Sequence, residues 1–460
     1  MIDLENDFRK KLESNNAAEK KEALEALLSY DLNEELIAIV ANLFADSDKG
    51  VRDAASMLFT LQPYPEVPNY IVRYCFSDDI SIRNMAGEVL LKNGEYSIPA
   101  LVNELGNGNS DDEKFIIDIL GWIGNPHPVP QIIEVLKTNK DENVILACAE
   151  ALGNMQAEES VPILLDLLKN DVDEILTPTV MEALGKIGNK EAIDHFMRVY
   201  HNQDILTKYT IIESLGRVGD AESLGFLLEE LQHAESSLIG PIVKSSEHLL
   251  STLGFEIELN DDLKHIILKA LEESDEDTVM AAVKLLYNYE NKEIIEAFVL
   301  IFGTIEHLDE MLKNKFIQTH DVACNLILKR IINGGDNLKQ LLILFKEMSA
   351  LREELGFEPV SDLTQLEFLN KLSVLIDNPD EEIRMTATEL LFHINPKDAL
   401  LFADKIMNDQ NVWNRLKLIE LLNEVNEPEA IELVKKLAED SEEMVRERAQ
   451  SLLEEKNARK

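Results

Sequence analysis

The chain has 460 residues, and its 44 basic and 87 acidic side chains give a formal charge of -43 at pH 7. This length exceeds one compact core, so the chain is either several globular domains or one extended repeat array. The charge argues against nucleic acid and anionic membrane surfaces as partners, because both attract cationic proteins. The hydrophobic share of 45% is ordinary for a folded chain and disfavours intrinsic disorder.

The N-terminal segment is charged and contains no apolar stretch of signal-peptide length. No later run is long and apolar enough to insert into a membrane. Cys75, Cys148 and Cys324 lie far apart in apolar helical contexts, without a CxxC pair. We therefore expect buried thiols in a reducing compartment and place the chain in the cytoplasm.

Two periodic signals begin after residue 33 and predict repeated helix pairs. The prolines at 68, 99, 130 and 162 recur every 31 or 32 residues and each opens an apolar stretch. Proline in a first turn loses no hydrogen bond, so it starts the first helix of each pair. Leu-Gly motifs with leading glycines at 121, 153, 185 and 216 have the same period. Glycine there permits close helix approach and, in the L-G-x-I-G form, left-handed termination.

A third signal marks the start of the second helix in each pair. Acidic residues suited to an N-cap precede an aliphatic residue, as at Asp48, Asp79, Asp141 and Asp380. An arginine often follows the aliphatic residue, and we expect it to bridge to an acidic residue of the neighbouring repeat. The arginines of this series are Arg52, Arg83, Arg384 and Arg446.

Together these signals resemble the HEAT repeat, in particular its phycobilisome-lyase-type variety. The pattern consists of D-x-x-V-R-x-x-A, then A-L-G-x-I-G, and a first helix that begins with proline. The resemblance covers residues 34–232, returns at 361–456, and implies an all-α solenoid, an armadillo-type superhelix of about a dozen helix pairs. We expect capping helices in 1–33, regular repeats in 34–235, irregular helical repeats in 236–360, and C-terminal repeats with a cap in 361–460. Longer single helices are expected at 308–332 and 337–355.

The resemblance also raises enzymatic functions. Deoxyhypusine hydroxylase holds its di-iron centre through repeated His-Glu dipeptides, which this chain lacks, and we interpret its nine scattered histidines as partly exposed helix residues. HEAT-like DNA glycosylases need a cationic groove, which a charge of -43 disfavours. A phycobilin-lyase-like or chaperone-like subunit acting on a cofactor-bearing protein stays open as the alternative. No other catalytic motif occurs, and we expect no cofactor and no metal site.

An acidic residue stands two positions before the leucine of the second helix in seven repeats: Glu88, Asp118, Glu150, Glu182, Glu213, Glu389 and Glu420. The second helices of a HEAT array line its concave face, so these residues would form an acidic groove. They either bind a basic or extended segment of a protein partner or only favour helix formation and solubility.

The expected function is a non-catalytic scaffold for protein–protein interaction. Trp122 and Trp413 are expected to pack in the core or between repeats, and Trp413 is the better candidate for an exposed anchor.

Overall fold

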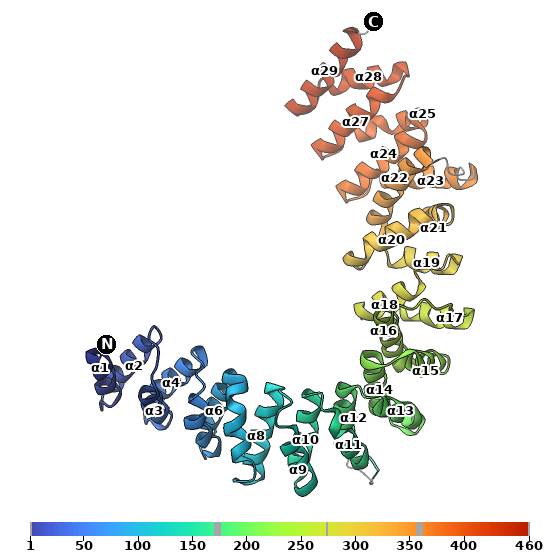
Figure 1. Ribbon diagram of the computed structural model, residues 1–460. Coiled ribbons are helices and arrows are strands. Elements are labelled where there is room, and N and C mark those ends of the chain that lie inside the picture. The colour runs from blue at the N-terminus through green and yellow to red at the C-terminus, as the bar shows by residue number, and fades with distance from the viewer. Residues whose placement is uncertain (1, 170–175, 273–274, 356–361, 459–460) are drawn as a thin grey trace. The chain divides into compact units, whose positions relative to one another are not determined.

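The computed structural model describes residues 2–169, 176–272, 275–355 and 362–458 (Figure 1). In these ranges the chain forms 29 α-helices and six short 3-10 segments, without any strand. The all-α prediction is confirmed. Contacts between Cα atoms divide the chain into two compact units, residues 1–258 and residues 259–460.

Unit 1 is a stack of helix pairs in which each first helix is followed by a second helix on the inner side of the stack (Figure 1). The first helices are α1 (Ile2–Leu12), α3 (Glu34–Asn42), α5 (Val67–Ile71), α7 (Ile98–Glu104), α9 (Val129–Thr138), α11 (Val161–Leu167), α13 (Lys190–Val199) and α15 (Ala221–Leu231). The second helices are α2 (Ala17–Leu27), α4 (Lys49–Leu61), α6 (Ile80–Asn93), α8 (Ser110–Ile123), α10 (Glu142–Asn154), α12 (Leu176–Ile187), α14 (Ile205–Val218) and α16 (Ser236–Leu253).

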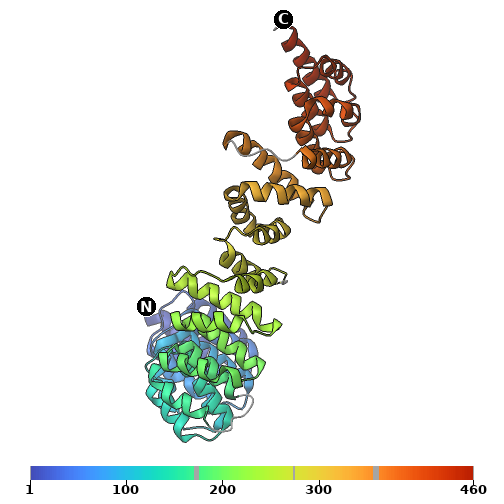
Figure 2. The ribbon, with the colours of Figure 1, turned by 90° about the vertical axis from the view of Figure 1, so that its right-hand side faces the viewer.

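Unit 2 repeats the arrangement, and Figure 2 shows its paired helices from a second direction. The first-layer helices are α17 (Asp261–Ala270), α19 (Lys292–Ile301), α21 (His320–Asn333), α23 (Asp362–Leu375), α25 (Pro396–Ala399), α26 (Ala403–Ile406) and α28 (Pro428–Leu437). The second-layer helices are α18 (Glu276–Leu286), α20 (Glu306–Gln318), α22 (Leu338–Leu355), α24 (Glu381–Ile394), α27 (Val412–Glu424) and α29 (Glu443–Ala458).

The prediction of one helix over 308–332 is wrong, because the helix is interrupted at Thr319, between α20 and α21. The backbone of Thr319 leaves the helical region, with φ -104° and ψ 35°. Its hydroxyl donates a hydrogen bond to the Lys315 carbonyl at 2.9 Å. A threonine that bonds to the preceding turn competes with helix continuation. The expected long helix at 337–355 does form, as α22.

The predicted helix starts are confirmed. Proline lies in the first turn of α5, α7, α9 and α11. The side chains of Asp48, Asp79, Asp141 and Asp380 accept backbone amides as N-caps of α4, α6, α10 and α24. These local signals set where each helix begins, and the aliphatic core residues on their buried faces then hold the pairs together.

The predicted close approach of the second helices is also confirmed. A Cβ at Gly121 would lie 2.9 Å from the Cα of Ala151, and one at Gly153 would lie 2.7 Å from the Cα of Ala183. Neighbouring second helices therefore meet backbone to backbone. The expected left-handed ending occurs at Gly124 and Gly188, each with φ 69°, whereas Gly219 is extended with φ -68°.

All three cysteines are buried, as the apolar sequence around them predicted. Burial raises the pKa of Cys75 and of Cys148 to about 12, so both remain protonated thiols at neutral pH. The interpretation of the histidines as partly exposed is wrong for His320, which is buried. A ring nitrogen of His320 lies 3.3 Å from the Met348 carbonyl oxygen of α22.

Candidate functional site

Five of the seven predicted acidic positions lie on consecutive second helices of unit 1. We call Glu88, Asp118, Glu150, Glu182 and Glu213 the inner acidic row; they belong to α6, α8, α10, α12 and α14. Asp118 is half-buried and the other four are exposed. The glycine contacts establish a common register across α8, α10, α12 and α14. These four helices form three successive interfaces. In each interface, the glycine that lies three residues after the acidic residue of one helix approaches the residue that directly follows the acidic residue of the next helix.

The carboxylates of the inner acidic row differ in their counter-ions. Lys114 lies 2.6 Å from Asp118 and Lys186 lies 2.9 Å from Glu182, each one turn away on the same helix. Glu88, Glu150 and Glu213 form no ion pair with any residue in the described ranges. Exposed pairs of this kind are weak, about 0–1 kcal/mol. The row therefore retains net negative charge available to a partner.

The two remaining positions, Glu389 and Glu420, lie in unit 2 and are engaged in an ion-pair network. Glu389 is half-buried and accepts from Lys346 of α22 at 2.7 Å and from Lys417 of α27 at 3.4 Å. Lys417 also lies 2.9 Å from Glu420, and this hydrogen bond raises the pKa of Lys417. Acidic and basic side chains alternate here. The sequence pattern is the same in the two units, but its electrostatic surroundings are not.

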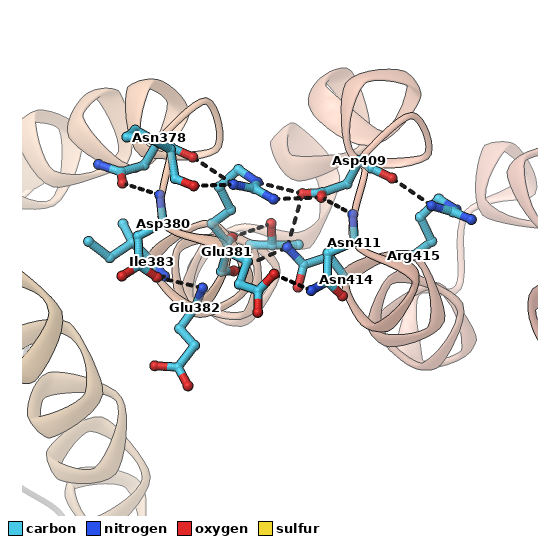
Figure 3. A network of polar contacts seen from close by, with 12 residues as sticks. Asn378, Asp380, Glu381, Glu382, Ile383, Asp409, Asn411, Asn414 and Arg415 are labelled. Atoms are coloured by element: carbon cyan, nitrogen blue, oxygen red, sulfur yellow. Dashed lines mark hydrogen bonds and ion pairs between the residues drawn. The ribbon is translucent and has the colours of Figure 1, made fainter.

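Some of the arginines at the start of the second helices bind a carboxylate of the neighbouring repeat, and Figure 3 shows the polar contacts around one such carboxylate, that of Asp409. Arg384 donates from Nε and Nη2 to the two carboxylate oxygens of Asp409, both at 2.8 Å. Burial alone would raise the pKa of Asp409, but hydrogen bonds from Arg384 and Asn414 outweigh it and leave that pKa lowered. Arg83 bridges to Asp112 through a single contact, from Nη2 to Oδ1 at 3.1 Å. The predicted bridge to the neighbouring repeat is confirmed for Arg83 and Arg384.

The bridge prediction is wrong for Arg52 and Arg446. Their Nη1 groups donate instead to backbone carbonyls six residues earlier, Asp46 and Asp440, each at 2.7 Å.

Sequence reasoning also missed Arg415, which binds both oxygens of Asp440, at 2.9 and 3.1 Å. The polar Asn414 occupies the place of the aliphatic residue and hid the pattern. The available signal was spacing, because Arg415 lies 31 residues after Arg384 and 31 before Arg446.

The expectation that both tryptophans pack in the core or between repeats is wrong. Trp122 on α8 is 61% exposed and Trp413 on α27 is 60% exposed. Trp413 lines an open groove of about 650 Å³ across α24, α27 and α29, which we call the Trp413 groove. Its lining residues are Met385, Trp413, Leu416, Lys417, Glu420, Met444, Glu447 and Arg448. Of the two tryptophans, Trp413 was the predicted candidate for an exposed anchor.

Two further observations concern chemistry and membranes. Among the described residues, no group of three or more His, Cys, Asp or Glu side chains is arranged to hold a metal ion. In the same ranges, no helix has the length and apolar character required to cross a membrane.

Two segments of the chain match a known protein family. Residues 98–178 and 370–454 match the HEAT-repeat family. No curated protein matches the sequence. Among solved structures, one similar chain comes from a homology model of the full-length AP-3 complex in an intermediate open conformation. It is 14% identical, covers 97% of this chain and 89% of its own length, and has a TM-score of 0.35.

Two other structures show comparable similarity. A chain from a structure of Kap95p and RanGDP is 12% identical over 97% of this chain and 66% of its own length, with a TM-score of 0.42. An engineered protein is 16% identical over 99% and 98%, with a TM-score of 0.26. The family match falls on repeats of both units, and the stacked helix pairs have the expected architecture. The chain therefore contains HEAT repeats, at residues 98–178 and 370–454.

Proposed function

We propose that this chain is a non-catalytic scaffold that binds another protein, and that the inner acidic row receives a basic, extended segment of that partner. Stacked helical repeats present long continuous surfaces suited to such segments. The observation that carries the proposal is the common register of Asp118, Glu150, Glu182 and Glu213, together with the lack of counter-ions at Glu88, Glu150 and Glu213 among the described residues.

The geometry of stacked helices suggests a spacing for the partner. Packed helices lie about 8–10 Å apart, so carboxylates in register on neighbouring helices have roughly that separation. An extended chain advances about 3.3 Å per residue. A lysine or arginine at about every third residue would therefore meet successive acids. Each exposed pair contributes about 0.2–1 kcal/mol, so affinity would come from several pairs acting together.

Glu389 and Glu420 contribute less to this proposal than the other five. Lys346 and Lys417 already neutralise them, and a cationic partner would first have to displace these lysines. We therefore centre the proposed binding surface on unit 1.

The experiment is a fluorescence-anisotropy titration with a labelled, extended peptide that carries lysine at every third residue. Changing Glu150, Glu182 and Glu213 to Lys should weaken binding about tenfold, because three sign changes along one surface alter its potential together. The wild-type affinity should fall as ionic strength rises past about 0.15 M, where the Debye length is roughly 8 Å. The triple variant should have the flatter salt response.

A matched variant changes Glu134, Glu159 and Glu191 to Lys, which alters the net charge equally. These three exposed glutamates lie on α9, on a 3-10 turn and on α13, all in the first-helix layer. If both variants lose the same affinity, overall charge and not the inner acidic row governs binding. Circular dichroism checks that each variant remains helical. Pigment or stoichiometric metal that co-purifies with the chain would instead favour the lyase-like alternative.

A further inference from the structure

The Trp413 groove is apolar at its centre and crosses three consecutive second helices of unit 2. Trp413 and Met444 are 60% and 53% exposed, and they occupy equivalent positions on α27 and α29. Met385 and Leu416 form a second equivalent pair on α24 and α27. Large apolar side chains gathered on one surface usually mark an interaction site. Tryptophan is also the residue type most often found at the energetic centre of interfaces.

The charges around the groove are of two kinds. Lys417 and Glu420 form an ion pair at 2.9 Å, and Lys417 also forms an ion pair with Glu389. Glu447 and Arg448 on α29 are exposed and form no ion pair with any residue that the structure describes. The groove thus presents one unsatisfied acid and one unsatisfied base beside an apolar centre.

We propose that the occupant of the Trp413 groove is a second copy of this chain, in a twofold symmetric pair. A twofold interface places the same surface on both partners, so it must be complementary to itself. A surface with an apolar centre and adjacent, unpaired Glu447 and Arg448 meets this condition. Arg448 of one copy faces Glu447 of the other, and the pairing occurs twice. Trp413 and Met444 of each copy cover the apolar centre of its partner.

The overall charge favours this groove over other surfaces for self-association. Two copies of a chain with a charge of -43 repel each other. The groove is a locally neutral surface, since its two cations, Lys417 and Arg448, balance Glu420 and Glu447. Contact there brings together apolar surface with the least added repulsion.

A charge-swap experiment on the full-length chain tests the pairing. Glu447→Arg places two cations on each copy, and Arg448→Glu places two anions. Each variant alone should self-associate at least about tenfold more weakly than the wild type, because like charges then face each other. An equimolar mixture of the two variants should associate again, because both cross-pairs become opposite in sign. Sedimentation equilibrium from about 1 μM to about 1 mM covers the relevant affinities.

Two controls identify the groove. Trp413→Ser should abolish association, and in a Trp122→Phe background the fluorescence of Trp413 should shift to shorter wavelength as concentration rises. Lys397→Glu on α25 and Glu439→Arg in the turn after α28 make the same charge changes at exposed positions outside the groove and should leave association unchanged. A wild-type chain that stays monomeric throughout, or a variant mixture that does not associate, overturns the proposal. Circular dichroism excludes unfolding as the cause.

Discussion

Lys315 on α20 is a charged residue with only 2% of its surface exposed. Its Nζ lies 5.5 Å from the centre of the Tyr287 ring and forms no ion pair with any described residue. Burial lowers the pKa of Lys315, and nearby Glu290 opposes that shift only in part. The helical pattern of residues alone does not reveal this burial, because it depends on residues distant in the chain, such as Tyr287.

Replacing Lys315 with Met should stabilise the chain by on the order of 1 kcal/mol at neutral pH, since an apolar side chain avoids the cost of a buried charge. The lowered pKa in the folded state means that this cost is present at neutral pH and disappears as pH rises from the folded pKa through the unfolded value of about 10.4. Urea unfolding at about pH 7 and about pH 10 should show the advantage of the variant shrinking. Lys292→Met, at an exposed position of α19, should change little at either pH.

The inner layer of unit 1 depends on glycines whose absence of a side chain permits backbone contact. Gly153→Ala would place a methyl group 2.7 Å from the Cα of Ala183, so α10 and α12 would have to separate. Overpacking of this kind costs about 1–3 kcal/mol. Gly225→Ala, on α15 with nothing within 4 Å, should instead stabilise by about 0.5–1 kcal/mol because alanine favours the helix. Thermal unfolding should shift in opposite directions, and equal shifts would refute the close packing.

The Arg384–Asp409 bridge between repeats makes a pH-dependent contribution. The pKa of Asp409 is lowered in the folded state, so the charged carboxylate stabilises the fold above its unfolded pKa of about 3.9. This stability is lost as pH falls from there through the folded pKa. Asp409→Asn should therefore cost about 1–3 kcal/mol at about pH 6 and less at about pH 3, which lies below the unfolded pKa.

Asp404→Asn removes an exposed partner of Lys436 and serves as the control in the same urea titrations. Its effect should stay near zero at both pH values, as for other exposed pairs. A loss for Asp409→Asn that is independent of pH would show that packing, and not charge, accounts for the contribution of the carboxylate.

Across the whole molecule, the sequence predicted those features that depend on residues within one helical turn. Prolines, aspartate caps and glycines act within one turn, so the helix pairs and the register of the acidic positions could be predicted. Contacts between distant residues could not. The neutralisation of Glu389 depends on Lys346, 43 residues earlier. The exposure of Trp122 and Trp413 depends on which side of each helix its neighbours cover, and a shift of one residue turns a side chain by about 100° around the helix.

The inner faces of the two units consequently differ in chemistry despite a common repeat. Unit 1 presents a row of carboxylates, and unit 2 presents an apolar groove among balanced charges. A scaffold with two such surfaces can hold a basic segment on one and pair with a second copy through the other. The two proposals can fail independently, because they involve different residues in different units.

Photo-crosslinking would locate a basic segment bound along the inner acidic row. The peptide with lysine at every third residue would carry a benzophenone group, and mass spectrometry would identify the labelled residues of the full-length chain. We expect labels on α6, α8, α10, α12 and α14, which disappear when glutamates replace the lysines of the peptide. Labels concentrated on the first helices of unit 1, or on α24, α27 and α29, would contradict the proposal.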